Sequence, residues 1–417
     1  MKTIEVWADW VFLHTPQKIG TLIASITRGK EIFSFEYEKD WLKSSNKFQI
    51  DPKLQLFEGK YHPPEGVKNF GVFLDSSPDR WGEVLMLRRE ALYAKEEQRA
   101  VKTLMPSDFL LGVYDENRMG GLRFKIGDGP FLDDHHKKAT PPWTTLRELE
   151  QASLALEEEG AENDPHFSEW LQLLFAPGSS LGGTRPKANV LDTSNNLWIA
   201  KFPSKNDIKD AGAWEAVVYE LARNCGIKVA EAKVQKLANK YHTFLVQRFD
   251  RTTDGRRIHF ASAMTLLEHK DGDNADSGAS YSEFVDFIIS HGSPRHVDSD
   301  LEELWKRIVF SIAVSNSDDH LRNHGFLLTQ DGWILSPAYD INPNEMATGL
   351  SLNISLESNA LDYDLAKSVA KDFRLSSAKA NEIIAAVKTE VALWKGLANK
   401  YGIGRPEQER MQKAFRV

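Results

Sequence analysis

A helix-forming stretch that runs straight into a dense polar cluster is the feature that most limits how this chain can fold. Residues 301–314 carry apolar side chains at helical spacing, and the sequence SNSDDHLRNH follows at 315–324. The apolar runs GFLL and GWIL come next and predict a β-hairpin. The cluster is open to three interpretations: a polar surface loop, a metal site, or a catalytic loop.

Composition restricts the function. The 417 residues allow two or three domains, and the net charge of −8 argues against the chain binding nucleic acid by itself, because neutralising phosphates needs concentrated Lys and Arg. A single cysteine, Cys225, excludes an internal disulfide and a Cys-based zinc site. The sequence contains neither a signal peptide nor a spanning apolar run. We therefore expect a cytoplasmic protein without a membrane partner.

The metal-site interpretation implies a metal-dependent hydrolase. Its candidate ligands would be Asp318, Asp319, His320, His324 and Asp340. The helical His-Glu-x-x-His arrangement is missing, and no third imidazole stands at a recognisable spacing. The interpretation also leaves the upstream Gly-rich loop and strand lysine unexplained.

A phosphotransfer interpretation accounts for more positions. Asp318 would act as the base for an attacking hydroxyl, while Asn323 and Asp340 would hold Mg²⁺ through oxygen atoms. Asp318 and Asn323 are five residues apart, as in the catalytic loops of protein kinases. The predicted hairpin can return Asp340 to the side of Asn323.

Three upstream features fit the same chemistry. The flexible sequence GSSLGGTRPK at 178–187 could bring backbone N–H groups to a phosphate, or could be an ordinary surface turn. Lys201, in a predicted strand, could clamp the α- and β-phosphates or simply face solvent. Glu215 could orient that lysine, or favour a helix N-terminus. Loop, lysine, glutamate, Asp-x₄-Asn, hairpin and Asp follow the linear order of a kinase catalytic domain.

Nearly the whole chain resembles the HipA family of bacterial serine/threonine kinases, the toxin component of HipA–HipB systems. The polar cluster resembles that family's Asn-Thr-Asp-x-His-x-Lys-Asn loop, and LSPAYDINP resembles its Pro-x-Tyr-Asp-Ile segment. VQRFDR resembles the family's hinge strand, and SSLGGTRPKANV its Ser-rich loop. NFGVFLDSSPDRWGE and LLGVYDENRMGGLRF resemble its small N-terminal domain.

The resemblance implies an α+β fold. A protein-kinase-like core, with a β-rich N-lobe and a largely helical C-lobe, would follow a small β-rich domain. We expect that domain at 1–128, the N-lobe with the Gly/Ser-rich loop and hinge at 129–250, and the C-lobe at 251–417. Residues 127–143, rich in Gly, Pro and charge, are the predicted linker. A hairpin is expected within 110–126.

The resemblance also assigns residue roles. His320 would support catalysis by Asp318, and Gln247 and Phe249 would present backbone groups to adenine. The residues expected at the ATP phosphates are Ser179, Ser180, Gly182, Gly183, Lys187 and Lys201. Ser180 would be autophosphorylated, with Ser179 as the alternative, because GGTRPK departs from the family's loop sequence.

The expected function is therefore an ATP- and Mg²⁺-dependent serine/threonine protein kinase and toxin. The resemblance implies a translation-related protein substrate, such as an aminoacyl-tRNA synthetase, and a small helix-turn-helix antitoxin of HipB type. DNA would be reached only through that antitoxin. The alternative is a kinase-like binding module that acts as corepressor with little catalysis.

Overall fold

The computed structural model describes residues 1–132, 140–175, 183 and 185–417, which form two compact units. The first unit comprises Met1–Asn206, Leu237–Asn239 and Asp250–Ala261; the second comprises Asp207–Lys236, Lys240–Phe249 and Ser262–Val417. Both flanks of the predicted linker belong to the first unit, and its residues 133–139 lie outside the described part. The division at residues 128 and 250 stays a prediction.

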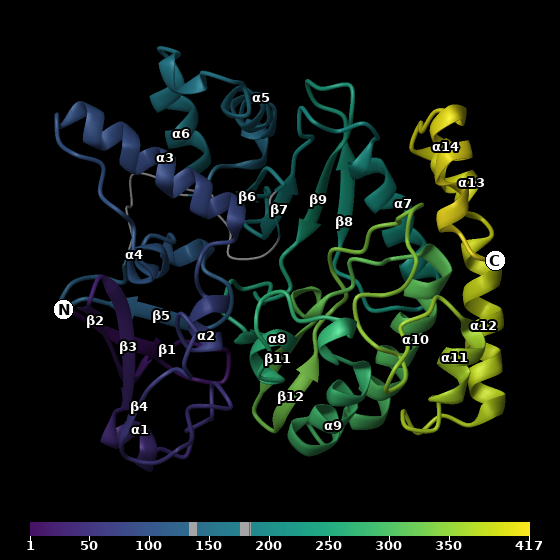
Figure 1. The fold of residues 1–417 in the computed structure, drawn as a ribbon, viewed down its shortest axis with the longest axis horizontal. Coiled ribbons are helices and arrows are strands. Elements are labelled where there is room, and N and C mark those ends of the chain that lie inside the picture. Colours follow the sequence, from purple (N-terminus) through teal and green to yellow (C-terminus); the bar gives the residue numbers. More distant parts are fainter. Residues whose placement is uncertain (133–139, 176–182, 184) are drawn as a thin grey trace. The chain divides into compact units, whose positions relative to one another are not determined.

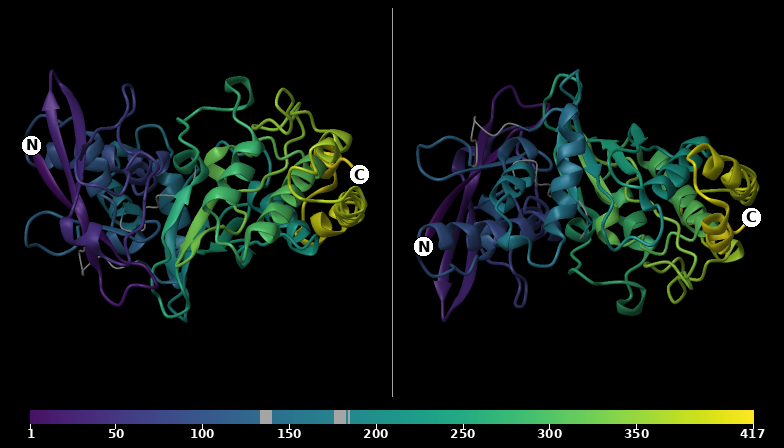
Figure 2. Two further views of the ribbon diagram at one scale, coloured as in Figure 1. Left: turned by 90° about the horizontal axis from the view of Figure 1, so that it is seen from below. Right: turned by 90° about the horizontal axis from the view of Figure 1, so that it is seen from above.

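An antiparallel sheet in the order β4-β3-β2-β1-β5 opens the first unit. Its strands are β1 (Lys2–Ala8), β2 (Gln17–Thr27), β3 (Lys30–Tyr37), β4 (Lys60–Tyr61) and β5 (Leu122–Lys125). Ile4, Val6 and Ala8 alternate along β1 and are fully buried, as period-two patterning requires. Gly20 is needed in β2, because a Cβ there would lie 2.3 Å from the ring of Phe35. In Figure 2 the long strands β1, β2 and β3 are drawn in purple.

Helices and a hairpin complete the first unit. They are α1 (Lys39–Lys43), α2 (Gly71–Asp75), α3 (Arg80–Glu96), α4 (Pro106–Leu111), η1 (Asp115–Asn117), η2 (Trp143–Thr145), α5 (Leu146–Leu156), η3 (Ala161–Asn163), α6 (Phe167–Phe175), β6 (Lys187–Leu191) and β7 (Leu197–Lys201). Strand β10 (Phe260–Ser262) begins in the first unit, and its last residue belongs to the second. Helix α3 begins after Pro78, and Asp79 caps it by accepting from the N–H of Gly82 at 2.7 Å. Strands β6 and β7 pair as an antiparallel hairpin.

The hairpin expected within 110–126 is wrong. Its first half ends α4 and enters η1, and only β5 is a strand, paired with β1. The cause is a buried guanidinium: Arg118 donates to the carbonyls of Ser76, Leu110 and Val113. These bonds stabilise a compact turn in place of a strand, because buried backbone carbonyls must be satisfied.

The second unit is largely helical. Its elements are α7 (Ala211–Asn224), β8 (Ala232–Gln235), β9 (Thr243–Gln247), α8 (Ala263–Leu266), η4 (Ala275–Ser277), α9 (Tyr281–His291), α10 (Val297–Val314), η5 (Leu321–Asn323), β11 (Gly325–Thr329), β12 (Gly332–Leu335), α11 (Tyr363–Ser368), α12 (Ser377–Val391), α13 (Trp394–Lys400), α14 (Arg405–Met411) and η6 (Gln412–Ala414). The helix predicted at 301–314 and the predicted β11–β12 hairpin are confirmed. The last four helices, yellow-green to yellow in Figure 1, lie along one side of this unit.

Helix α10 is the core of the second unit. It packs against α9, α11, α12 and β12, and the side chains of Leu301, Leu304, Trp305 and Ile308 are fully buried. The end of the chain returns to this helix: the N–H of Arg416 donates to Ala313 at 2.8 Å, and its Nε donates to the hydroxyl of Ser315 at 3.0 Å. Arg416 therefore fixes the C-terminal end of α10 and Ser315, the residue that follows it.

Candidate functional site

The polar loop, which we define as residues 315–324, leaves α10 through a left-handed turn. Ser315 has φ 52°, and the N–H of Asn316 donates back to Ser311 at 2.8 Å. The loop continues through η5 into β11, where the fully apolar GFLL segment is anchored. A buried helix and a buried strand thus fix both ends of the loop, which favours a functional site on a rigid scaffold.

Asp318 and His320 lie on the solvent-exposed side of the polar loop. The Asp318 side chain is 71% exposed, and its Oδ1 lies 3.8 Å from His320 Nε2. The N–H of Arg322 donates to His320 Nδ1 at 3.2 Å, so Nδ1 is an acceptor and carries no proton. An imidazole whose Nδ1 accepts a hydrogen bond carries its N–H on Nε2, the nitrogen that lies 3.8 Å from Asp318 Oδ1. His320 is therefore arranged to support a negative charge on that carboxylate.

Asp319 and His324 form a separate, buried network. His324 Nε2 lies 2.7 Å from Asp319 Oδ1, and Asp319 Oδ2 accepts from the hydroxyls of Tyr281 and Ser311. Burial alone raises the pKa of Asp319, but the attraction of His324 and these hydrogen bonds hold it below its ordinary value. Both oxygens are occupied inside the protein. In the part of the chain that the structure describes, no group of three acidic, His or Cys side chains could hold a metal. Two of the five candidate ligands of the hydrolase interpretation, Asp319 and His324, are thus engaged with each other.

Asn323 and Asp340 fit a Mg²⁺ site of few protein ligands. Asn323 Nδ2 donates to the carbonyl of Asp318 at 2.7 Å, which leaves the amide oxygen as its ligand atom. Asp340 has φ 56°, a conformation uncommon for a residue with a Cβ, and its Oδ1 accepts from Asn342 at 3.2 Å. An amide oxygen and a carboxylate are the hard donors that Mg²⁺ prefers, with phosphates and water completing the coordination.

Several residues that the sequence did not indicate hold the polar loop. Asn344 Nδ2 donates to the Ser317 hydroxyl at 2.7 Å, and the Ser351 hydroxyl donates to the Ser317 carbonyl at 2.8 Å. The N–H of Asn342 donates to Asn316 Oδ1 at 3.3 Å. Local sequence patterns carried no signal for them, since these bonds join residues that are 26, 27 and 34 apart along the chain.

The predicted hinge residues lie at the end of β9. The N–H of Gln247 donates to the carbonyl of Glu231 at 2.8 Å, so its carbonyl would be the group for the adenine amine. The ring of Phe249 lies 5.4 Å from that of Tyr339, centroid to centroid, at 35°. The hinge is thereby in contact with the segment that carries Asp340.

The predicted lysines lie in the first unit and are cross-strand neighbours. Lys187 in β6 pairs in register with Lys201 in β7, so both side chains lie on one face of the hairpin. Lys187 is buried, and its Nζ lies 2.8 Å from Asp79 Oδ2 and 3.0 Å from the Gly183 carbonyl. This ion pair gives Lys187 a structural role, and its contact with ATP stays a prediction. Ser179, Ser180 and Gly182 lie outside the described residues.

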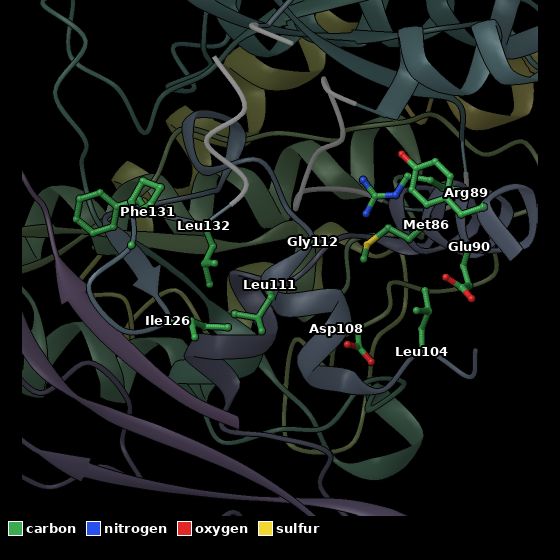
Figure 3. A pocket seen from close by; sticks show the side chains of 13 residues that line it. Met86, Arg89, Glu90, Leu104, Asp108, Leu111, Gly112, Ile126, Phe131 and Leu132 are labelled. Carbon is green, nitrogen blue, oxygen red and sulfur yellow. The ribbon is translucent and has the colours of Figure 1, made fainter. Parts of the chain in front are cut away.

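A pocket of about 570 Å³ lies elsewhere in the first unit (Figure 3). Met86, Leu104, Leu111 and Ile126 give it an apolar lining beside Glu90 and Asp108. Those two carboxylates are already engaged, Glu90 by Arg99 and Asp108 by Lys2 and Lys102. None of the predicted site residues lines this pocket.

The comparisons with known proteins decide the family. The model of the HipA-like C-terminal domain matches residues 179–394, more than half of the chain. The chain belongs to this HipA-like family. The match includes Lys201, Gln247 and the polar loop through Asp340.

Two curated relatives of this HipA-like chain are similar over part of their length. A Haemophilus influenzae protein named "Putative kinase" is 26% identical over 181 residues, which are 39% of this chain and 52% of that protein. Toxin YjjJ of Escherichia coli is 24% identical over 176 residues, which are 40% of this chain and 38% of the toxin. The chain thus matches about half of the first relative and less of the second.

A solved structure confirms the fold class. The chain resembles one from the Shewanella oneidensis HipA, HipB and operator DNA complex, with a TM-score of 0.64 at 16% identity, covering 99% of this chain and 94% of that one. The α+β, HipA-like fold predicted from the sequence is confirmed by this likeness. Among the described helices, none has the length and apolarity to cross a membrane.

His269 makes the stability of the HipA-like second unit dependent on pH. Its Nδ1 lies 3.0 Å from Asp273 and its Nε2 lies 2.9 Å from Glu283. Burial by itself lowers the pKa of His269, but the hydrogen bonds that its ring donates to the carboxylates of Glu283 and Asp273 raise this pKa above the ordinary 6.5. The same loop contacts the polar loop, since Asp271 lies 3.3 Å from Arg322.

We expect this bridge to stabilise the fold fully below pH 6.5 and to lose its effect as the pH rises through the raised pKa of His269. Urea unfolding of the wild type and His269→Gln between about pH 5.5 and about pH 9 measures this difference. The stability advantage of the wild type should shrink with rising pH. An advantage that is constant over the range contradicts the prediction.

Proposed function

We propose that this chain is an ATP- and Mg²⁺-dependent serine/threonine protein kinase of HipA type. The observation that carries the proposal is that two adjacent carboxylates of the polar loop have different surroundings. One carboxylate, Asp318, is exposed and faced by an oriented imidazole, while its neighbour Asp319 is buried in a structural network. Membership of the HipA-like family and a relative named as a kinase support it.

Each residue would then have one task. Asp318 would accept the proton of the attacking serine or threonine hydroxyl, and the Nε2–H of His320 would stabilise the carboxylate before that transfer. Asn323 and Asp340 would hold Mg²⁺, whose chemistry is to neutralise negative charge on the phosphates. Lys201 would contact the same phosphates, and Gln247 and Phe249 would bind adenine through their backbone.

The test is direct phosphotransfer. The purified chain is incubated with ATP labelled in the γ-phosphate, with Mg²⁺ or with EDTA, and labelled residues are mapped by mass spectrometry. We expect labelled serine only with Mg²⁺. The absence of both nucleotide binding and labelling, in protein shown by mass to carry no phosphate beforehand, contradicts the proposal.

The proposal includes autophosphorylation of Ser180. A phosphate there would place about −1.5 to −2 charges where the ATP phosphates should bind, and would silence the enzyme. Self-labelling should disappear in Ser180→Ala and persist in Ser179→Ala. The reverse pattern would assign the modification to Ser179, and label in neither position would remove this mode of regulation.

The proposed setting is the cytoplasm, as the toxin of a toxin–antitoxin pair. The substrate would be a translation-related protein such as an aminoacyl-tRNA synthetase, and the partner a small helix-turn-helix antitoxin of HipB type. The similar Shewanella chain comes from a complex with HipB and operator DNA, and a relative is named a toxin. Co-purification with the product of an adjacent small gene tests the partner, and DNA binding should require that product.

A further inference from the structure

Tyr339 connects three segments of the second unit that the proposed site needs. Its hydroxyl donates to the carbonyl of Arg322 at 2.7 Å, and its ring packs against Phe249 at 5.4 Å. Arg322 directly precedes Asn323, and Tyr339 directly precedes Asp340. One side chain therefore joins the residues next to both proposed metal ligands and contacts the hinge.

The bond from Tyr339 restricts the backbone next to each proposed ligand, at Arg322 before Asn323 and at Tyr339 before Asp340. Asn323 is held on its other side, because its Nδ2 donates to the Asp318 carbonyl at 2.7 Å. Asp340 adopts φ 56°, which a non-glycine residue keeps only where its surroundings enforce it. The Tyr339–Arg322 bond spans the β11–β12 hairpin and is placed to enforce this geometry. A bond of this kind fixes a site rather than creating it.

We infer that Tyr339 is a positioning residue that sets the spacing of Asn323 and Asp340 for Mg²⁺ and couples that spacing to the adenine side of the site through Phe249. The inference rests on the proposed function. It adds that the two parts of the Tyr339 side chain have separate effects. The hydroxyl acts on Mg²⁺-dependent nucleotide binding, while the ring acts on nucleotide binding with or without Mg²⁺. The two parts of one side chain can therefore be tested separately.

The experiment is calorimetric titration of the full chain with ADP, over a series of Mg²⁺ concentrations and in EDTA, for the wild type, Tyr339→Phe and Tyr339→Leu. Tyr339→Phe removes only the hydroxyl, and should raise the Mg²⁺ concentration for half-maximal binding about two- to tenfold, the range for one lost hydrogen bond. Its ADP affinity in EDTA should match the wild type. Tyr339→Leu also removes the contact with Phe249, and should weaken ADP binding in both conditions.

Tyr37→Phe is the matched control. It removes a hydroxyl bond to a backbone carbonyl of similar length, to Leu54 at 2.8 Å, in the first unit. It should leave the Mg²⁺ dependence unchanged, and circular dichroism checks that each variant is folded. A Tyr339→Phe variant with wild-type Mg²⁺ dependence overturns the inference while leaving the proposed function intact. A wild-type chain that binds no ADP in either condition overturns the proposed function itself.

Discussion

Asp318→Asn should lower phosphotransfer by about 10²- to 10⁴-fold, the usual contribution of a general base. Asn cannot accept the proton of the attacking hydroxyl, although it keeps the size of Asp. The Asp318 side chain is 71% exposed, so the substitution should leave both the free energy of unfolding and ADP affinity nearly unchanged. Initial rates of label transfer, compared at equal nucleotide occupancy, measure the loss.

The adjacent Asp319→Asn is the control that the sequence itself provides. Asp319 is buried and contacts His324, Tyr281 and Ser311, so replacing its charge should cost about 3 kcal/mol of stability. The Asp318 carboxylate should thus determine the rate of phosphotransfer, and the Asp319 carboxylate should determine the stability of the fold. Equal losses of rate in the two variants, at a temperature where both are folded, would remove Asp318 from its proposed role.

Asp79→Ala should destabilise the first unit by about 3–5 kcal/mol, because it leaves the ammonium of Lys187 buried and uncompensated. The pair is 2.8 Å apart, and both side chains are almost wholly buried. Burial raises the pKa of Asp79 despite the attraction of Lys187, so desolvation is the larger effect. Asp79 also caps α3, and the Trp81 indole donates to the Lys187 carbonyl at 3.1 Å, so the α3–β6 contact depends on this pair. Chemical denaturation with a first-unit fluorescence signal measures the loss.

The double variant Asp79→Ala, Lys187→Met is the control. Removing both charges should recover most of the lost stability, since apolar side chains replace a buried ion pair well. Lys187→Met alone also decides whether this lysine binds ATP. Weaker ADP binding in a folded Lys187→Met protein would support the sequence-based role, and unchanged binding would leave Lys187 with its structural task. A double variant as unstable as Asp79→Ala would contradict the ion-pair account.

Local patterns predicted much of the second unit. The apolar periodicity of residues 301–314 predicted α10, and GFLL with GWIL predicted the β11–β12 hairpin. The hairpin expected within 110–126 failed because Arg118, 42 residues from Ser76, donates to its carbonyl inside the core. A period-two pattern contains no information about a charged side chain that will be buried beneath it.

The sequence by itself determined α10, the β11–β12 hairpin, the family resemblance and the five-residue spacing of Asp318 and Asn323, since each depends on neighbours along the chain. Only the tertiary structure decided what the charges contact. It buried Lys187 against Asp79, 108 residues away, joined the N–H of Arg322 to Nδ1 of His320, and joined Tyr339 to Arg322. The physical reason is that partners for buried polar groups are chosen when distant segments pack, and desolvation then fixes the role of each group.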